Sequence, residues 1–515
     1  TPQAVPLECW KAGYNLGNLG FQQGNWQLAI EGYSQAVDAV KLTRSWARTD
    51  ERRQQILEES IGIYHNLAQA YLNTNQLQKA WETVESSKAR NLVERLANRD
   101  LQPKGYDASF RLTQEVPSMA FEEVQQVINQ HTALIEWYIT TQQIIAFVVT
   151  HQNTQPFVWQ SSAEEGKALG NLITDYLNSY YQEKPSQWKQ QLPDNFNQLA
   201  QLLHLDELLA QIPPECDQLI LVPHWFLHLF PLHALSGNRQ IATSEGETVE
   251  TVSGCLLDLF PGGVRYAPSC QLLQLAQQQQ RPQPQRLFVV HNPTKNVNYT
   301  DLEIEAITSF FPDSQPEILH RQNATSVKTH PDLPNANCIH FSCHGGFNRN
   351  SPLESGLFLA SETEGKEDSI LTLAEIFALN LTNCRLVTLS ACETGMIDPN
   401  NESDEYIGLP SGFLFAGSPS VVGSLWDLSD LSTTFLMAEF YRRYKQENLP
   451  VAVALNQAQI WLRDATTQQL QDWIGQFSLS PIQQYLVEEY LEECYPHQKP
   501  FQHPFYWAAF FDVGR

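Results

Sequence analysis

Small and aromatic residues recur at helical spacing through roughly the first 100 residues of the chain. Within residues 14–37 they stand at Leu16, Gly17, Gly20, Gly24, Trp26, Ala29, Tyr33 and Ala36. A second run follows, with Tyr64, Leu67, Ala68, Tyr71, Asn75, Leu77, Ala80 and Val84. Small residues let two helices approach closely, and aromatic side chains fill the gaps between them. The pattern therefore predicts two helix pairs, and residues 81–98 are predicted to form one long amphipathic helix that leads out of them.

The two runs resemble tetratricopeptide repeats, in which paired helices stack on their neighbours. The equivalent alanines Ala29 and Ala80 are 51 positions apart, whereas the usual period of these repeats is about 34 residues. This difference predicts an extra helical insertion around residues 43–59. Because such units bury their faces only by stacking, we expect the two copies to need contacts from further repeats or from the rest of the chain.

Strand-like apolar runs begin at about residue 130 and alternate with helical patterns. The strands are expected at residues 133–137, 144–150, 219–222, 287–290, 338–342 and 386–389. Helices are expected at residues 302–310, 373–378 and 434–444. This alternation predicts an α/β domain with a largely parallel sheet. The glutamine-rich stretch 271–286 is interpreted as a surface linker.

Composition limits which partners and which compartment are expected for the protein. The 515 residues carry a formal net charge of −25, which argues against nucleic acid as a partner of the chain alone, because nucleic acids are normally bound by a basic face. No stretch approaches the ~18 apolar residues of a membrane span, and residues 1–6 lack the basic and apolar regions of a secretory signal. The nine cysteines are scattered, without a CxxC pair or a zinc-type spacing, as is typical of a reducing compartment. We therefore expect a cytoplasmic protein of two or three domains, without a membrane partner.

Two of the expected strands are followed by residues that could be catalytic. His344 follows the strand 338–342 and precedes Gly345, and Cys392 follows the strand 386–389. Ligands gather beyond the carboxyl ends of parallel strands, so these two side chains would face each other if the strands were neighbours. A nearby imidazole promotes the thiolate of a cysteine and later gives a proton to the leaving amine. The backbone amides of Gly345 and Cys392 would then be the donors to the oxyanion.

Each of these residues also has a structural interpretation. A lone histidine in a strand is usually a core or surface residue, and a lone cysteine usually acts as a small hydrophobe; we interpret His340 and Cys343 in this way. Ser342 has a histidine beside it, but no GxSxG elbow surrounds it. A metal site from His340, Cys343 and His344 would have the wrong spacing for one face of a strand. We therefore expect no metal and no other cofactor.

Two carboxylates follow a third predicted strand, at residues 421–425. Asp427 and Asp430 lie in a Trp-Asp-x-x-Asp segment and would form a negatively charged specificity pocket beside the proposed dyad. Such a pocket binds a Lys or Arg side chain through charge-assisted hydrogen bonds. The alternative is that one aspartate only caps the helix that begins near Leu431.

The order of these motifs resembles that of CHAT-domain peptidases, a caspase-related family that is allied to separase and is found attached to tetratricopeptide repeats. The resemblance extends from about residue 120 to the C-terminus. It rests on residues 221–232, 266–269, 340–345, 389–395, 417–419, 422–430 and 503–510.

The resemblance implies a caspase-like α/β/α sandwich, with a repeat domain at residues 1–115, a pseudo-protease half at 116–280 and an active half at 281–515. It implies a cysteine endopeptidase that forms a thioester at Cys392, with His344 as its partner in the dyad. The similarity to the separase branch implies cleavage after a basic residue that Asp427 or Asp430 recognises. The repeats are expected to bind a protein regulator, while the substrate is another protein.

Two further interpretations remain. The chain could be a scaffold in which the repeats recruit protein partners and the α/β domain is latent or inactive. It could also catalyse an acyl transfer other than peptide hydrolysis, which product analysis would reveal.

Overall fold

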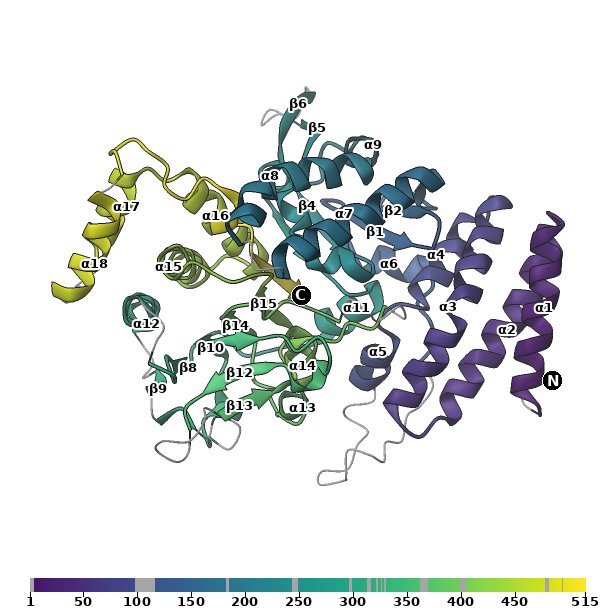
Figure 1. Cartoon of the computed structure of the whole chain (residues 1–515), viewed down its shortest axis with the longest axis horizontal. Coiled ribbons are helices and arrows are strands. Elements are labelled where there is room, and N and C mark those ends of the chain that lie inside the picture. Colours follow the sequence, from purple (N-terminus) through teal and green to yellow (C-terminus); the bar gives the residue numbers. More distant parts are fainter. Residues whose placement is uncertain are drawn as a thin grey trace.

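The computed structural model describes residues 4–97, 116–181, 185–242, 249–295, 299–312, 316–320, 323–325, 327, 330–361, 369–398, 404–477, 481–492 and 494–515. A helical region lies at one end of the molecule and a large sheet occupies its centre (Figure 1). In these described ranges, no helix is both long enough and apolar enough to cross a bilayer.

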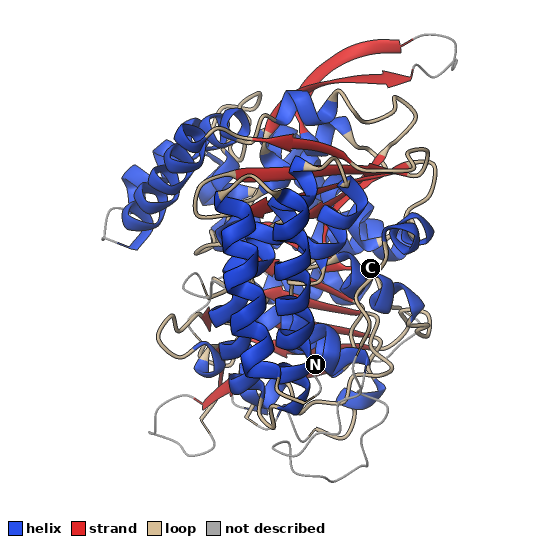
Figure 2. Cartoon of the chain, turned by 90° about the vertical axis from the view of Figure 1, so that its right-hand side faces the viewer, coloured by secondary structure: helices blue, strands red, loops and turns tan. Residues whose placement is uncertain are grey.

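The N-terminal part of the structure is helical. Its helices are α1 (Pro6–Gln22), α2 (Trp26–Trp46), α3 (Asp50–Asn73), α4 (Leu77–Glu85) and α5 (Arg90–Ala97). Helices α1 and α2 lie side by side (Figure 2), and their backbones touch where Gly17 meets Gly32, because a Cβ on Gly32 would stand 2.3 Å from the Gly17 nitrogen. The predicted helix pairs are therefore present. The extra helical insertion is not: residues 43–59 belong to the end of α2 and the beginning of α3, so longer helices account for the spacing.

The predicted long helix over residues 81–98 was also wrong, because the chain bends between α4 and α5. Ala89 has a positive φ of 44°, a conformation that ends an α-helix. At this bend the fully buried Lys88 donates from Nζ to the Pro223 carbonyl at 2.7 Å and to Asp404 Oδ2 at 3.3 Å. The Ala89 nitrogen donates to the Asp404 carbonyl at 3.1 Å. The bend thus joins the helical region to the segment that follows Cys392.

The main sheet has 11 strands among the described residues, in the order β3-β2-β1-β4-β7-β16-β15-β14-β10-β8-β9. Its strands are β1 (Thr132–Ile139), β2 (Ile144–Thr150), β3 (Phe157–Gln160), β4 (Gln218–Val222), β7 (Gly263–Tyr266), β8 (Leu287–His291), β9 (Glu317–His320), β10 (Cys338–Ser342), β14 (Leu386–Ser390), β15 (Ser420–Ser424) and β16 (Phe510–Gly514). Pairing is parallel except at β1–β2, β2–β3 and β15–β16. The predicted α/β class and largely parallel sheet are confirmed, and each of the six expected strands corresponds to an observed one.

Two small sheets flank the main one. The first consists of β11 (Gly345–Gly346), β12 (Gly356–Leu359) and β13 (Ser369–Thr372), and it begins directly after β10. The second is the hairpin of β5 (Ser236–Ala242) and β6 (Val249–Cys255). This hairpin projects from the body of the molecule (Figure 2).

Helices cover both faces of the main sheet. They are α6 (Phe121–Val127), α7 (Ala163–Tyr181), α8 (Pro185–Leu202), α9 (Leu205–Leu209), α10 (Leu256–Leu259), α11 (Cys270–Gln278), α12 (Thr300–Ser309), α13 (Leu373–Ile376), α14 (Leu409–Ala416), α15 (Asp430–Gln446), α16 (Val451–Asp464), α17 (Thr467–Ile474) and α18 (Pro481–Glu492). In β1, Leu134 and Tyr138 pack in a core with α4, α6 and α11, whereas Ile135 and Trp137 pack in a core with α7 and α8. Since side chains alternate along a strand, a strand covered on both faces is apolar throughout.

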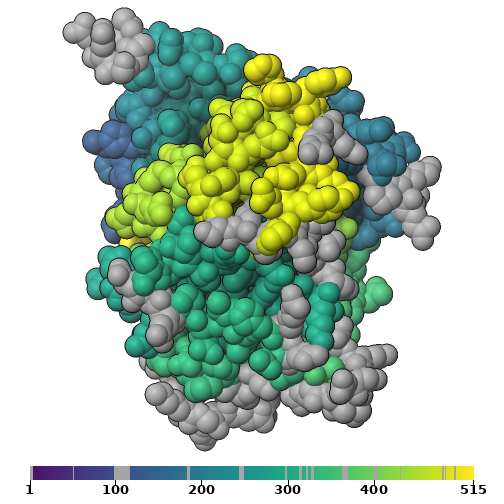
Figure 3. All heavy atoms as spheres, turned by 90° about the vertical axis from the view of Figure 1, so that its left-hand side faces the viewer, coloured from purple at the N-terminus to yellow at the C-terminus, as the bar shows by residue number. Residues whose placement is uncertain are grey.

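The predicted surface linker at residues 271–286 was wrong in its first half, which belongs to α11. Gln271 is held there by its nitrogen, which donates to Glu85 Oε1 at 2.8 Å. The C-terminal part of the chain, which contains α15 to α18, lies on the face shown in Figure 3 (yellow-green to yellow). The predicted boundary between residues 280 and 281 falls between α11 and β8, and the one at residue 115 adjoins a segment outside the described residues. Both boundaries remain predictions.

Candidate active site

His344 and Cys392 follow two neighbouring strands in matched register. Strand β10 pairs in parallel with β14, and Ser342 lies opposite Ser390 at the ends of the two strands. His344 and Cys392 each come two residues after these ends, at the same edge of the sheet. Both residues are partly exposed. Sequence reasoning required that the two strands be neighbours, and they are.

The turn that carries Cys392 is held by the end of β15. Ser424 donates from Oγ to the Ala391 carbonyl at 2.6 Å, and its nitrogen donates to Thr394 Oγ1 at 3.1 Å. The Gly395 nitrogen donates to the Ser424 carbonyl at 2.7 Å. These bonds fix the backbone on both sides of the cysteine, so that its position is set by the sheet.

The backbone of this turn is restricted at two residues. Gly395 passes so close to β16 that a Cβ there would lie 2.3 Å from the Phe511 ring. Glu393 has a positive φ of 55°, which non-glycine residues rarely adopt. Strained backbone of this kind gathers at functional sites because the surrounding structure must hold it in place.

The sulfur of Cys392 has two polar neighbours from the segment after β15. Its thiol donates to Asp427 Oδ1 at 2.8 Å, and the Leu428 nitrogen donates to the sulfur at 3.5 Å. Asp427, which the sequence assigned to a specificity pocket, therefore contacts the candidate nucleophile directly. Its carboxylate lies at the surface.

Trp426 anchors the segment that carries Asp427. It is 1% exposed, and its Nε1 donates to the Phe505 carbonyl at 3.0 Å. Its ring meets the Trp188 ring edge-on at 5.5 Å between centroids. Because Trp188 lies on α8 and Phe505 lies near the C-terminus, distant parts of the chain fix this position.

Tyr180 is a site residue that sequence reasoning missed. It lies on α7, and its hydroxyl donates to Glu393 Oε1 at 2.7 Å and accepts from the Asp427 nitrogen at 3.2 Å. Burial, followed by the nearby Glu393 carboxylate, raises the pKa of Tyr180, so that the hydroxyl keeps its proton. One side chain from α7 thus ties the turn that carries Cys392 to the segment that carries Asp427. A lone tyrosine on an amphipathic helix gives no signal of this role.

On the histidine side, the backbone is tied to the small sheet. The His344 carbonyl accepts from the Phe358 nitrogen at 2.9 Å, and Gly345 pairs with Leu357. A Cβ on Gly345 would stand 2.7 Å from the Cys392 carbonyl oxygen. Only glycine permits the main chain to run this close to the cysteine. The assignment of the Gly345 and Cys392 amides to an oxyanion hole remains a prediction.

The neighbours of His344 in β10 have structural partners, as the sequence suggested. His340 Nε2 lies 3.0 Å from Glu303 Oε1, and Ser342 Oγ donates to Glu303 Oε2 at 2.9 Å. Cys343 is 3% exposed, and burial raises the pKa of its thiol. Glu303, on α12, was not predicted; it fixes the strand that leads to His344.

Asp430 is the first residue of α15, and its side chain lies outside the described residues. The N-cap position of this helix is held by Ser429. Neither aspartate therefore occupies the cap position that the alternative interpretation required.

A second histidine group lies along the same edge of the sheet. His291 ends β8 opposite Ser342 and His320. Its Nδ1 lies 3.0 Å from Nδ1 of His320, and its Nε2 lies 3.0 Å from Asp301 Oδ1. The apolar pattern of residues 287–290 predicted this strand but not the polar group at its end.

Two groups of possible metal ligands occur in the part of the chain that the structure describes. Glu85, Glu136 and Cys270 are buried together, and Glu317, His330 and Asp332 lie nearer the surface. In each group the ligand atoms lie within 4.8 Å of one another. Neither group contains His344 or Cys392.

Solved structures similar to this chain include that of separase in its complex with securin from Saccharomyces cerevisiae, with a TM-score of 0.53 and 12% identity. The similarity covers 98% of this chain and 39% of the separase chain, so the chain spans about two fifths of that protein. The Arg-specific cysteine proteinase gingipain R of Porphyromonas gingivalis gives a TM-score of 0.30 at 7% identity, over 49% of this chain and 54% of its own. No curated protein matches the chain in sequence.

The likeness to separase shows that the two proteins share a fold. The sequence pattern of the CHAT domain matches residues 194–515, which is more than half of the chain. This region contains β10, β14 and β15, the three strands whose ends carry His344, Cys392 and Asp427. The chain therefore belongs to the CHAT domain family.

Proposed function

We propose that the protein is a cysteine endopeptidase in which His344 and Cys392 form the catalytic dyad. The observation that carries this proposal is the register of β10 and β14, which sets both residues two positions beyond paired strand ends. Membership of a family with a peptidase fold supports it.

In this mechanism His344 takes the proton of the Cys392 thiol, and the sulfur attacks the carbonyl carbon of the scissile peptide bond. The tetrahedral oxyanion is stabilised by the backbone amides of Gly345 and Cys392. When the C–N bond breaks, His344 returns the proton to the leaving amine and a thioester remains on Cys392. Water, deprotonated by His344, then hydrolyses the thioester and restores the thiol.

The contact between Cys392 and Asp427 adds a step before catalysis. The thiol must leave Asp427 Oδ1 before its proton can pass to His344, so the carboxylate has to turn away. A Lys or Arg side chain of the substrate, immediately before the scissile bond, would draw the carboxylate into a charge-assisted pair. We therefore propose that Asp427 both recognises a basic substrate residue and releases the thiol, with Asp430 as the second candidate for recognition.

The test is a cleavage profile on a peptide library, with the parent protein, Cys392→Ala and the matched control Cys494→Ala. Cys494 is also a partly exposed cysteine, and it lies about 100 residues after Cys392 in the chain. We expect cleavage after Arg or Lys by the parent and by Cys494→Ala, and none by Cys392→Ala. Equal cleavage by all three proteins would contradict the proposal.

A second experiment assigns the preference for a basic residue to one of the two carboxylates. Asp427→Asn and Asp430→Asn are each assayed on a pair of peptides that carry Arg or Gln before the scissile bond.

A latent scaffold that recruits protein partners through its helical region is the second candidate. The contact between the Cys392 thiol and Asp427 favours the scaffold, because a thiol that is hydrogen-bonded to a carboxylate is not ready to attack a substrate. An electrophilic peptide that ends in arginine distinguishes the cases. Labelling of Cys392 in the isolated protein indicates an enzyme, and labelling only after a protein regulator is added indicates a latent one. Absence of labelling under both conditions indicates a scaffold.

A further inference from the structure

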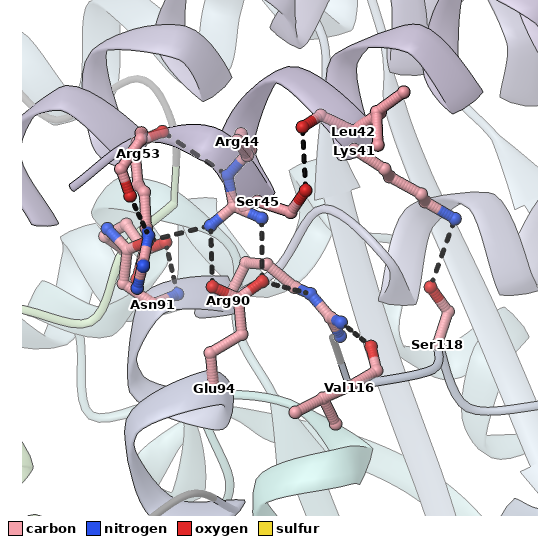
Figure 4. Close-up of polar contacts among 12 residues, drawn as sticks. Lys41, Leu42, Arg44, Ser45, Arg53, Arg90, Asn91, Glu94, Val116 and Ser118 are labelled. Carbon is pink, nitrogen blue, oxygen red and sulfur yellow. Dashed lines mark hydrogen bonds and ion pairs between the residues drawn. The ribbon is translucent and has the colours of Figure 1, made fainter. Parts of the chain in front are cut away.

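A cavity of about 260 Å³ lies where the helical region meets the rest of the molecule. Its walls come from α2, α3 and α5, and from the segment that precedes α6 (Figure 4). It is remote from Cys392 in the chain, and the proposed peptidase mechanism does not use it.

The cavity gathers positive charge in a chain whose net charge is −25. Its charged lining residues are Lys41, Arg44, Arg53, Arg90, Asp38 and Glu94. Four of these six side chains are cationic. The three arginines are only 4–6% exposed, so their charges lie in surroundings that screen them poorly.

Two of the arginines share one carboxylate. Arg44 Nη1 donates to Glu94 Oε1 at 3.0 Å, and Arg90 Nε donates to the same oxygen at 3.2 Å. Arg44 also donates from Nη2 to Asn91 Oδ1 at 2.8 Å, which is a neutral acceptor. Two guanidinium groups therefore share the Glu94 carboxylate, and Asp38 is the only other acidic residue among the lining residues. The lining thus holds two more cationic than acidic side chains, and buried charge of one sign favours a ligand of the opposite sign.

We propose that this cavity is a binding site for a small molecule that carries a phosphate group. Guanidinium groups offer paired N–H donors that match two phosphate oxygens, and an ammonium adds a mobile point charge. Lys41 Nζ stands at the wall of the cavity, 3.2 Å from Ser118 Oγ (Figure 4). The cavity is enclosed by helices on several sides, which suits a compact anion better than an extended polymer.

The site is connected to the segment that follows Cys392. Arg90 donates from Nη1 to Gln271 Oε1 of α11 at 3.0 Å. The nitrogen of the next residue, Asn91, donates to Glu405 Oε1 at 2.8 Å. A ligand that binds Arg90 and Arg44 would thus stabilise the contacts between the helical region and the sheet. Ligand binding is therefore expected to raise the melting temperature of the whole protein.

The test uses inorganic pyrophosphate as the probe, titrated calorimetrically into the full chain at constant ionic strength. Ser118→Asp puts a carboxylate beside Lys41, and Ser118→Asn is the matched control of the same shape without the charge. We expect saturable binding by the parent, a loss of about tenfold or more in affinity for Ser118→Asp, and less than about threefold for Ser118→Asn. Lys41→Met should weaken binding, whereas Lys11→Met, on the exposed side of α1, should not. Melting temperatures of all variants verify that they fold.

Two results would overturn the proposal. One is the absence of saturable pyrophosphate binding by the parent beyond what sulfate gives at the same ionic strength. The other is equal affinity of Ser118→Asp and Ser118→Asn, which would place any anion site elsewhere on the protein.

Discussion

Asp427 Oδ1 lies 2.8 Å from Cys392 Sγ, and this contact joins the turn after β14 to the segment after β15. The carboxylate accepts a hydrogen bond from the thiol, and ionisation of the sulfur would place two negative charges side by side. Such an arrangement disfavours the thiolate. Under the proposed mechanism, Cys392 therefore stays unreactive until the carboxylate turns away.

We therefore expect Asp427→Asn to make Cys392 more reactive toward iodoacetamide at neutral pH. The amide oxygen can still accept a hydrogen bond, but the charge that opposes the thiolate is gone, so alkylation should accelerate by about fivefold or more. Mass spectrometry of the Cys392 peptide measures the rate, with the Cys494 peptide of the same sample as the internal control. An unchanged rate at Cys392 would show that the carboxylate does not restrain the thiol.

Tyr180→Phe should impair cleavage with little effect on folding. The substitution removes the hydroxyl that bridges Glu393 and the Asp427 nitrogen, and leaves the ring that packs against Trp188 at 4.9 Å. We expect kcat/KM to fall by about tenfold, which corresponds to roughly 1.4 kcal/mol, and the thermal midpoint to change by a few degrees. Tyr181→Phe is the matched control, because that ring lies beneath Arg349. Equal effects of the two substitutions would assign Tyr180 a packing role only.

Lys88→Met should destabilise the protein strongly, because it leaves Asp404 buried without its cation. Removal of one partner from a buried ion pair costs about 3–5 kcal/mol. The double variant Lys88→Met/Asp404→Asn should recover part of this loss, since no uncompensated charge remains. Lys79→Met is the control, because its ion pair with Glu82 leaves the lysine side chain 59% exposed and should contribute less than about 1 kcal/mol. Denaturant unfolding gives the free energies of the parent and the three variants, and a double variant that is no more stable than Lys88→Met would contradict the coupling.

Glu405 is expected to make stability depend on pH. Burial raises the pKa of this carboxyl from 4.5 to about 7, so the folded protein holds the proton more tightly than the unfolded chain does. The resulting stabilisation is complete below pH 4.5 and is lost as the pH rises through about 7. It amounts to at most about 3 kcal/mol.

Glu405→Gln should therefore lose less stability than the parent between pH 5 and pH 8. Denaturant unfolding at both pH values measures the difference, with the exposed Glu122→Gln as the control. Some pH dependence should persist in the Gln variant, because burial also raises the pKa of Asp512 to about 8. Identical slopes for parent and Glu405→Gln would mean that Glu405 titrates normally.

The strands of the sheet could be predicted because most of them are covered on both faces. Residues 133–137 and 338–342 are nearly continuous apolar runs, which distinguish buried parallel strands from amphipathic helices. The ends of the strands that precede His344 and Cys392 could also be predicted, because polar or small residues follow the apolar run there. Parallel pairing of β10 and β14 then follows from the usual course of such folds.

The contacts of the site could not be predicted in the same way. Tyr180 and Glu303 lie on helices whose patterns encode only a buried face, and their hydroxyl and carboxylate partners come from strands far along the chain. The bend at Ala89 was missed because alanine favours helices, whereas the contacts that hold the bend come from Pro223 and Asp404, which are distant in the chain. The longer α2 and α3 produced the spacing that was attributed to an insertion.

Strand β16 lies between β15 and β7 and so closes the seam between the early strands and the late ones. It follows all the other described strands of the sheet along the chain. Until residue 514 has emerged, a nascent chain holds two part-sheets, each with an open edge that invites association with other chains. The Gly395 turn, which packs against Phe511 of this strand, lacks its support during that interval. The turn that carries Cys392 can therefore take its final position only after residues 510–514 have been synthesised.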